Sequence, residues 1–308
     1  MHENESRHVR SEATATGGEE RNVHLGFCSM NTTEDLAPSV LARALENAGF
    51  ESLWFGEHSH IPMSRKSPYP AGGELPEPYK KTMDPYVSLM AAAAATEHLK
   101  LGTSVSLLME RELFSQAKTI ATLDQLSKGR LTIGCGVGWN QEEFENATRL
   151  PWQRRYRVIK ETVAAQRVLF REDAPEFHGE MIDFDPVWFE PKPQQDGGPP
   201  ILFGAMGPQG IRHAVEWADG WIPVDFGITP DVETGIREFR QVVRDSGREP
   251  DDFQITLIVM SEVTSDLLKR YRDLGVHRCN IGVHHENWDK PETVMPLIED
   301  YARLIPAL

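Results

Sequence analysis

Short hydrophobic runs alternate with longer amphipathic segments along nearly the whole chain. A short apolar run bounded by Gly, Pro or polar residues is typical of a buried strand, whereas apolar residues three and four positions apart predict a helix. The runs predict eight strands, at residues 23–29, 51–55, 99–105, 131–137, 201–203, 220–224, 253–259 and 277–283. Helices are predicted between them, among others at residues 33–48, 84–97, 152–170, from Pro208 onward and at 293–305.

Eight strands that alternate with helices within 308 residues predict an α/β fold, a single (β/α)8 TIM barrel. A doubly wound open sheet is the alternative, but it typically carries a GxGxxG motif after the first strand, and this chain has none there. Two segments interrupt the alternation. Residues 59–83 form a long Pro- and Gly-rich loop after the second strand, of a length typical of lids, and residues 177–188 predict an inserted β-hairpin.

Residues 1–22 are polar and charged, so we expect a disordered N-terminal extension ahead of a barrel domain at residues 23–308. The extension lacks the apolar core of a signal peptide. A net charge of −15 argues against nucleic acid and anionic membranes as partners, and no stretch is apolar enough to cross a bilayer. The cysteines, Cys28, Cys135 and Cys279, lie far apart in the sequence and predict reduced thiols in a cytoplasmic protein.

Chemistry in a TIM barrel lies at the carboxyl ends of the strands. Glu57 and His58 follow the second predicted strand. A histidine at this place can exchange a proton with a carbonyl or a ring nitrogen, and a neighbouring carboxylate can orient it. A structural hydrogen bond between Glu and His at the start of a loop explains the pair equally well.

Glycines cluster after the fourth predicted strand, in the sequence Gly-Cys-Gly-Val-Gly-Trp-Asn at residues 134–140. They would let a flat ligand lie against bare backbone, with Trp139 as an aromatic wall. The small residues at 102–105 would admit a planar ring or simply taper the barrel. The Gly-rich turn at 203–210 enters a helix, whose free backbone amides favour an anion such as phosphate, although a plain tight turn is the alternative.

Two other chemistries find little support in the sequence. His284, His285 and Glu286 are consecutive, so the two imidazoles point in different directions, and no HxxxH spacing lies nearby; we predict no metal site. The chain has no GxSxG motif and no cysteine in a polar setting, which disfavours a hydrolase.

Taken together, these segments resemble one known family. The helix and strand at residues 117–140 resemble the bacterial luciferase-like superfamily of flavin and deazaflavin oxidoreductases, and further segments extend the resemblance from residue 23 to residue 225. These segments are residues 53–62, 69–70, 72–76, 101–103, 177–180, 191–193 and 218–221. Within the superfamily they are similar to the branch of coenzyme F420-dependent oxidoreductases. The C-terminal third carries no matching motif.

The resemblance implies that a flavin-like cofactor lies across the strand ends, that hydride transfer occurs at the deazaflavin C5, and that a non-prolyl cis peptide falls within residues 102–105. It implies catalytic roles for His58 and Glu57, as a pair beside the ring. The cofactor-binding residues that it implies are Ser104, Val105, Gly136, Gly138, Trp139, Gly204, Ala205, Met206 and Gly207. Two places depart from the family pattern: Ala205 stands where glycine is usual, and residues 110–113 replace an Asp-Pro opening of the next helix.

These observations favour an oxidoreductase that moves a hydride between coenzyme F420 and a small organic substrate, with His58 as acid or base and Glu57 tuning it. Four cations in the long loop favour F420, whose acidic glutamyl tail FMN lacks. They are Arg65, Lys66, Lys80 and Lys81. Two alternatives stay open: a two-component monooxygenase that uses reduced FMN, and a non-catalytic flavin-binding barrel. We expect a homodimer, with a small-molecule substrate and a flavin or F420 reductase as partners.

Overall fold

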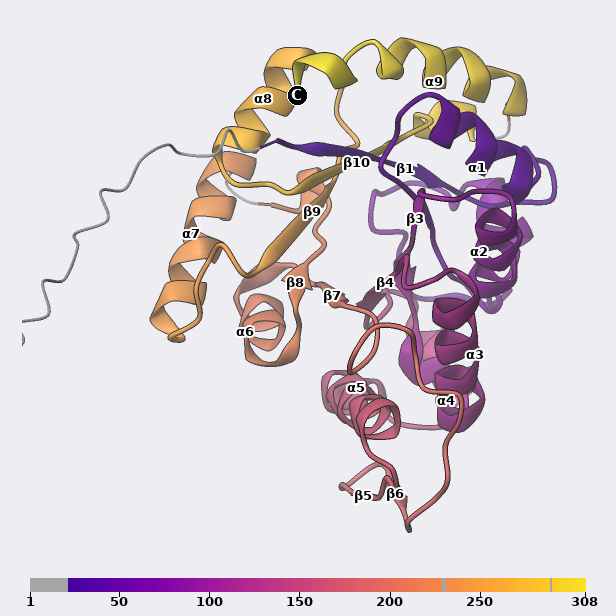
Figure 1. Ribbon diagram of the computed structural model, residues 1–308, viewed down its shortest axis with the longest axis vertical. Coiled ribbons are helices and arrows are strands. Elements are labelled where there is room, and N and C mark those ends of the chain that lie inside the picture. Colours follow the sequence, from indigo (N-terminus) through magenta and orange to yellow (C-terminus); the bar gives the residue numbers. More distant parts are fainter. Residues whose placement is uncertain (1–21, 229–230, 289) are drawn as a thin grey trace, which may run out of the picture.

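In the computed structural model, which describes residues 22–228, 231–288 and 290–308, eight parallel strands close into a barrel (Figure 1). Around the barrel the strands follow the order β1-β10-β9-β8-β7-β4-β3-β2, so strands adjacent in the chain are adjacent in the barrel. The strands are β1 (His24–Ser29), β2 (Ser52–Phe55), β3 (Lys100–Ser106), β4 (Leu131–Gly136), β7 (Ile201–Gly204), β8 (Gly220–Trp221), β9 (Gln254–Ile258) and β10 (Arg278–Gly282). The predicted TIM barrel is confirmed. Of the predicted N-terminal extension, residues 1–21 lie outside the described residues.

Helices cover the outside of the barrel, with α1, α2 and α3 on one side and α6, α7 and α8 on the other (Figure 1). Their bounds are α1 (Pro38–Asn47), α2 (Pro85–Ala94), α3 (Leu113–Leu126), α4 (Gln141–Thr148), α5 (Arg155–Arg171), α6 (Gly207–Trp217), α7 (Val232–Asp245), α8 (Ser265–Asp273) and α9 (Val294–Ala302). The sequence analysis did not predict α4, because its segment QEEFENAT offers a single large apolar residue, Phe144. None of these helices, within the part of the chain that is described, has the length and apolar character that crossing a membrane requires.

Proline residues explain two boundaries that differ from the prediction. The helix predicted over residues 33–48 begins at Pro38, since proline fits the first turn of a helix but cannot donate a hydrogen bond within it. Strand β8 ends at Trp221 instead of Val224, because Pro223 has no amide to continue the ladder. Val224 pairs with β9 again only as an isolated bridge.

The inserted hairpin consists of β5 (Phe177–His178) and β6 (Asp183–Phe184), which pair antiparallel and stand away from the barrel beside α5 (Figure 1). The hairpin is therefore present, as predicted, and its paired part is short. The long loop after β2 carries a single 3-10 turn, η1 (Glu77–Lys81). A second 3-10 turn, η2 (Leu108–Glu110), follows β3.

The indole of Trp54 fills the inside of the barrel. Its ring lies between Gly26 and Gly102, where any side chain would overlap it, and its Nε1 donates to Ser52 Oγ at 2.7 Å. Toward the carboxyl ends of the strands, three half-buried side chains pack on Trp54 and two other buried side chains. We call this cluster of six side chains the apolar floor. The half-buried side chains are Cys28, Val105 and Ile258, and the buried ones are Trp54, Leu202 and Ile222.

An ion pair closes the opposite end of the barrel interior. Arg278 donates from Nε and Nη2 to the two carboxylate oxygens of Glu51, at 2.5 and 2.6 Å. Burial opposes ionisation of this carboxyl group, but the hydrogen bonds and charge of Arg278 lower the pKa of Glu51 to about 2. The barrel interior thus holds a buried ion pair toward its amino end and apolar side chains toward its carboxyl end.

Candidate active site

The peptide bond between Ser104 and Val105, at the end of β3, is cis. The resemblance had placed such a bond within residues 102–105, and this expectation is confirmed. The Val105 side chain lies over Gly136 and Gly204, where an added β-carbon would come within 2.8 and 2.9 Å of its methyl groups. The two glycines are therefore required to seat Val105, so the protein's own packing already explains their identity.

His58 is hydrogen-bonded to Glu143 of α4, and the atoms His58 Nδ1 and Glu143 Oε2 lie 2.7 Å apart. The other carboxylate oxygen of Glu143 accepts from the Ser59 amide at 3.0 Å. The Glu143 side chain is 1% exposed and that of His58 11%. Glu143 is fixed in turn because Asn140 caps α4 by accepting from the Glu143 amide. This arrangement holds the imidazole in place, and Nε2 has no hydrogen-bond partner among the described residues.

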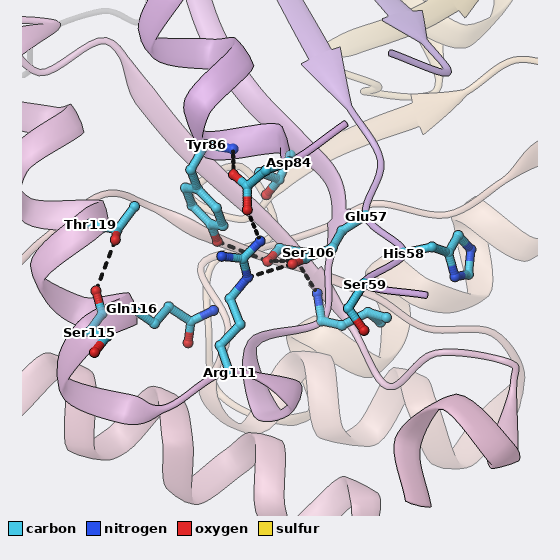
Figure 2. Close-up of polar contacts among 12 residues, drawn as sticks. Glu57, His58, Ser59, Asp84, Tyr86, Ser106, Arg111, Ser115, Gln116 and Thr119 are labelled. Carbon is cyan, nitrogen blue, oxygen red and sulfur yellow. Dashed lines mark hydrogen bonds and ion pairs between the residues drawn. The ribbon is translucent and has the colours of Figure 1, made fainter. Parts of the chain in front are cut away.

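Glu57 is also buried, but it belongs to a different network, drawn in Figure 2. Its Oε2 accepts from Ser106 Oγ at 2.5 Å and from the Leu107 amide at 2.9 Å, and its Oε1 pairs with Arg111 Nε. The Arg111 guanidinium reaches further to Asp84, at 2.6 Å. Glu57 thus ties the end of β2 to the end of β3 and to the segment that follows β3.

The proposed tuning of His58 by Glu57 is not what the structure contains. The imidazole points away from the network of Glu57 and Arg111 (Figure 2), and Glu143 takes the place expected for Glu57. Successive residues of an extended segment project to opposite sides, so neighbours in sequence at the end of β2 face different surroundings. No sequence signal singled out Glu143, because it is one of three glutamates in α4.

Aromatic rings surround His58 at the carboxyl end of the barrel. We call four of them the aromatic rim: Tyr69, Tyr79, Trp139 and Trp288. The His58 ring lies 5.3 Å from that of Tyr79 and 5.7 Å from that of Trp139, centroid to centroid and edge to face. Tyr79 also contacts Tyr69 and Trp288, at 5.4 and 5.8 Å. Trp139, expected to be an aromatic wall, is therefore part of a larger apolar enclosure around the imidazole.

The long loop at residues 59–83 brings Tyr69 and Tyr79 to the rim and is tied down at both ends. Near its start, Ser67 Oγ donates to Glu142 of α4 at 2.7 Å. Near its end, residue 82 forms an isolated bridge with Thr32. The loop is thus held by α4 on one side and by the segment after β1 on the other.

Three of the four loop cations have partners within the protein. Lys80 pairs with Glu77 and Lys81 with Glu34, each at 2.6 Å. Arg65 donates from Nε to the Ser67 carbonyl and lies over the Trp139 ring at 5.8 Å. The two lysine pairs are largely exposed, and such pairs contribute little to stability.

The turn between β7 and α6 presents backbone to solvent. Gly207 has a φ of +74°, and an added β-carbon there would meet nothing within 4 Å. Met206 precedes α6 without a side-chain cap, and because Pro208 has no amide hydrogen, the first turn offers an anion the amides of Gly207, Gln209 and Gly210. Ala205 is buried, and its methyl group packs against Gly210 in the first turn of α6. The methyl that departs from the family pattern therefore points into the protein.

Glu110 is a third carboxyl group in this region, at the end of η2. Its Oε2 is buried and receives no hydrogen bond from the described residues. Burial, with the negative charges of Glu143 and Glu57, raises the pKa of Glu110 to about 9. Sequence analysis noted residues 110–113 only as a departure from a pattern and assigned Glu110 no role.

A cavity of about 500 Å3 lies at the opposite end of the barrel, where β7, β8 and β9 begin. Its lining includes Arg167, Arg171, Asp219 and Gln254. The amino end of a TIM barrel serves stability rather than chemistry. Within the described residues, no group of three or more His, Cys, Asp or Glu side chains is placed to hold a metal ion. The candidate site is therefore the carboxyl end, around His58.

Residues 39–272 match the family of luciferase-like monooxygenases. The chain belongs to this family. An uncharacterized protein of Mycobacterium tuberculosis is 33% identical over 271 residues, which cover 87% of this chain and 94% of the relative. The phthiodiolone/phenolphthiodiolone dimycocerosates ketoreductase of Mycobacterium kansasii is 26% identical, over 86% of this chain and 76% of the relative.

Solved structures share the fold of this luciferase-like chain. An F420-dependent secondary alcohol dehydrogenase, solved with an F420-acetone adduct, aligns with a TM-score of 0.68. The alignment covers 92% of this chain and 98% of that one, at 18% identity. At 18% sequence identity, the alignment shows that the two proteins share a fold. It nevertheless includes the C-terminal third, for which the sequence had offered no motif, and places the whole described barrel within one architecture.

Proposed function

We propose that this luciferase-like enzyme is an F420-dependent oxidoreductase that interconverts a carbonyl group and the corresponding alcohol on a small organic substrate. The observation that carries the proposal is the pair of His58 and Glu143 at the carboxyl end of β2, with the His58 ring against Tyr79 and Trp139 of the aromatic rim. A buried carboxylate that holds one nitrogen of an imidazole leaves the other nitrogen to exchange a proton.

The residues at the carboxyl end fit a flat cofactor with a phosphate group. The apolar floor, which includes Val105, offers an apolar surface, and Trp139 belongs to the aromatic rim at the same end of the barrel. The free amides at the start of α6, next to Gly207, suit a phosphate. Lys66, exposed in the long loop, is the cation best placed to meet an acidic tail, since Lys80 and Lys81 already pair with glutamates.

Bound F420 would supply a carbon, C5, that gives or takes a hydride. The protein must then supply or remove the proton on the substrate oxygen. His58 Nε2 donates that proton when the carbonyl is reduced and accepts it when the alcohol is oxidised. Glu143 fixes the ring orientation and offsets positive charge on the imidazole as it develops. The aromatic rim excludes water from the same place.

Use of reduced FMN by a monooxygenase is a second candidate function. The floor and the start of α6 would serve FMN equally well, because both cofactors have a flat ring system and a phosphate. Lys80 and Lys81 already form ion pairs with Glu77 and Glu34. Because these two cations are then less available to bind the acidic tail of F420, the pairs favour FMN. The two proposals therefore differ chiefly in what binds near Lys66.

A titration of the cofactor-free protein with F420 and, separately, with FMN tests the proposal. We expect F420 to bind with a Kd of about 1 μM or below and FMN to bind at least about tenfold more weakly. Lys66→Gln serves as the matched variant: it should weaken F420 and leave FMN unchanged. The reverse preference would support the monooxygenase, and binding of neither cofactor would support a barrel without flavin chemistry.

A further inference from the structure

A positively charged side chain lies on the aromatic rim. Arg65, half-buried in the long loop, has its guanidinium carbon 5.8 Å from the centroid of the Trp139 ring. The same indole lies 5.7 Å from the imidazole of His58, centroid to centroid. Because a single indole lies beside both side chains, the guanidinium is within reach of a small molecule that is bound at His58.

Most of the hydrogen-bonding capacity of Arg65 is unused. A guanidinium offers five N–H donors in a planar fork. Nε donates to the Ser67 carbonyl at 3.1 Å, and the two Nη atoms donate to none of the residues that the structure describes. None of the described carboxylates forms an ion pair with Arg65 either. The side chain thus presents a positive charge and a free fork of donors.

Helix α4 fixes the loop backbone beside Arg65. Glu142 accepts from the Lys66 amide with Oε1 and from the Ser67 hydroxyl with Oε2, the latter at 2.7 Å. Ser67 Oγ accepts in turn from the Gln141 amide at 3.0 Å, in the first turn of α4. Both oxygens of this carboxylate are therefore directed at the loop backbone and Ser67. The anchor of the guanidinium is in place before a ligand binds, which reduces the entropy cost of binding.

Other cations at this end of the barrel are engaged or exposed. Arg111 donates to two carboxylates in the network of Figure 2. Lys80 and Lys81 pair with glutamates. Lys66, the next residue after Arg65, is exposed, and the proposed function places the acidic tail of F420 there. Arg65 remains as a cation for an anionic group that lies against the rim.

We propose that Arg65 binds an acidic group of the substrate, which is then a carbonyl compound that carries a carboxylate or a phosphate. The inference rests on the proposed function, which places the reacting oxygen at His58 Nε2. A guanidinium binds either anion through two parallel hydrogen bonds, and aromatic surroundings of low polarity strengthen them. Contacts at both ends of the substrate, with Arg65 and with His58, orient the carbonyl carbon for hydride transfer.

The first arm of the test measures, by calorimetry, the binding of levulinate, an oxo acid, and of its uncharged methyl ester to the full chain without cofactor. We expect the Kd of levulinate to be about 10- to 100-fold below that of the ester, and the two to be equal in Arg65→Gln. Arg43→Gln is the matched control, because Arg43 is exposed on α1 and its replacement removes the same charge. Equal affinities in the unmutated chain, undetectable binding of both probes included, overturn the proposal. A preference for the acid that survives in Arg65→Gln also overturns it.

The second arm measures kcat and KM of the loaded enzyme with the same two compounds. Arg65→Gln should raise KM for levulinate by about 10- to 100-fold, with kcat nearly unchanged and both constants for the ester unaffected. Arg65→Lys should restore part of the affinity, because lysine keeps the charge but lacks the planar fork. A fall in kcat for acid and ester alike would assign Arg65 to the packing of Trp139 and would overturn the proposal.

The acidic tail of F420 is a second source of the same chemistry, so Arg65→Gln is also titrated with F420 and with FMN. We expect both affinities to equal those of the unmutated chain. A loss of F420 affinity alone would mean that Arg65 binds the cofactor tail, and the assignment to the substrate would be overturned. If the unmutated chain binds neither cofactor, the proposed function fails, and the first arm alone decides whether Arg65 binds an acid.

Discussion

Glu57 and Glu143 are both buried carboxylates at the carboxyl end of the barrel, yet their partners differ in kind. Glu57 binds Arg111, a serine hydroxyl and an amide, none of which changes its protonation near neutral pH. Glu143 binds His58, the one side chain type whose ordinary pKa lies near neutrality. The comparison teaches that burial and satisfied hydrogen bonds mark both structural and chemical sites, and that the partner tells them apart.

The largest effect is expected from His58→Ala. Loss of the group that exchanges a proton with the substrate should lower kcat by about 100- to 10,000-fold, while cofactor affinity changes little. Steady-state kinetics and a cofactor titration on the same preparation check this. Turnover at the unmutated rate would remove His58 from the mechanism and with it the contrast between the two carboxylates.

Glu143→Gln should have the next largest effect. Glutamine has nearly the same shape and can still accept from the Ser59 amide, but it carries no charge to offset the imidazolium. We expect kcat to fall by about 10- to 100-fold, with a melting temperature close to that of the unmutated chain. If instead the melting temperature falls markedly and kcat of the folded fraction is unchanged, Glu143 is a structural residue like Glu57.

Glu57→Gln should show the opposite pattern. The amide group of glutamine would face the donors on Ser106 and Leu107, and the Arg111 guanidinium would keep only Asp84 as an anionic partner. We expect a loss of about 1 to 3 kcal/mol in the free energy of unfolding and little change in kcat of the folded protein. Denaturant unfolding and steady-state kinetics on the same variant test this expectation. A large loss of kcat without destabilisation would support the catalytic role that sequence analysis gave Glu57.

Sequence patterns were enough to predict the barrel, because the unit of an apolar run followed by a helix repeats eight times along the chain, and every repeat indicates the same fold. They also predicted that His58 lies at the carboxyl end of a barrel strand, and the structure places it just after β2. They could not identify its partner. Glu57 is adjacent in sequence, whereas Glu143 lies 85 residues away and meets His58 only because β4 and α4 stand beside the end of β2. Pairings of this kind arise from tertiary packing.

The roles of glycines are likewise difficult to predict from the sequence alone. Gly136 and Gly204 were expected to offer bare backbone to a ligand, and the structure uses their missing side chains to seat Val105. From the sequence, a glycine needed by the protein's own packing and one needed by a ligand look alike. Gly207, open on all sides at the start of α6, is the one of these three whose surroundings still leave room for a ligand.

Glu110 differs from both other carboxyl groups in the way it makes the stability of the fold depend on pH. The pKa of Glu110 is about 9 in the folded chain against an ordinary 4.5, so between these values the folded protein holds a proton that the unfolded chain has lost. Its contribution to stability is fully present below about pH 4.5 and is lost as pH rises through 9. The free energy of unfolding should fall across this window by up to about 1.4 kcal/mol per pH unit.

In Glu110→Gln this slope should be shallower than in the unmutated chain, whereas Glu112→Gln, at an exposed position, should keep it. Urea unfolding at pH 6, 7 and 8, for all three proteins, measures the difference. Equal slopes would mean that Glu110 is ionised in the folded chain. Glu110 would then be a second structural carboxylate beside Glu57, and the proposed proton transfer would involve the pair of His58 and Glu143 alone.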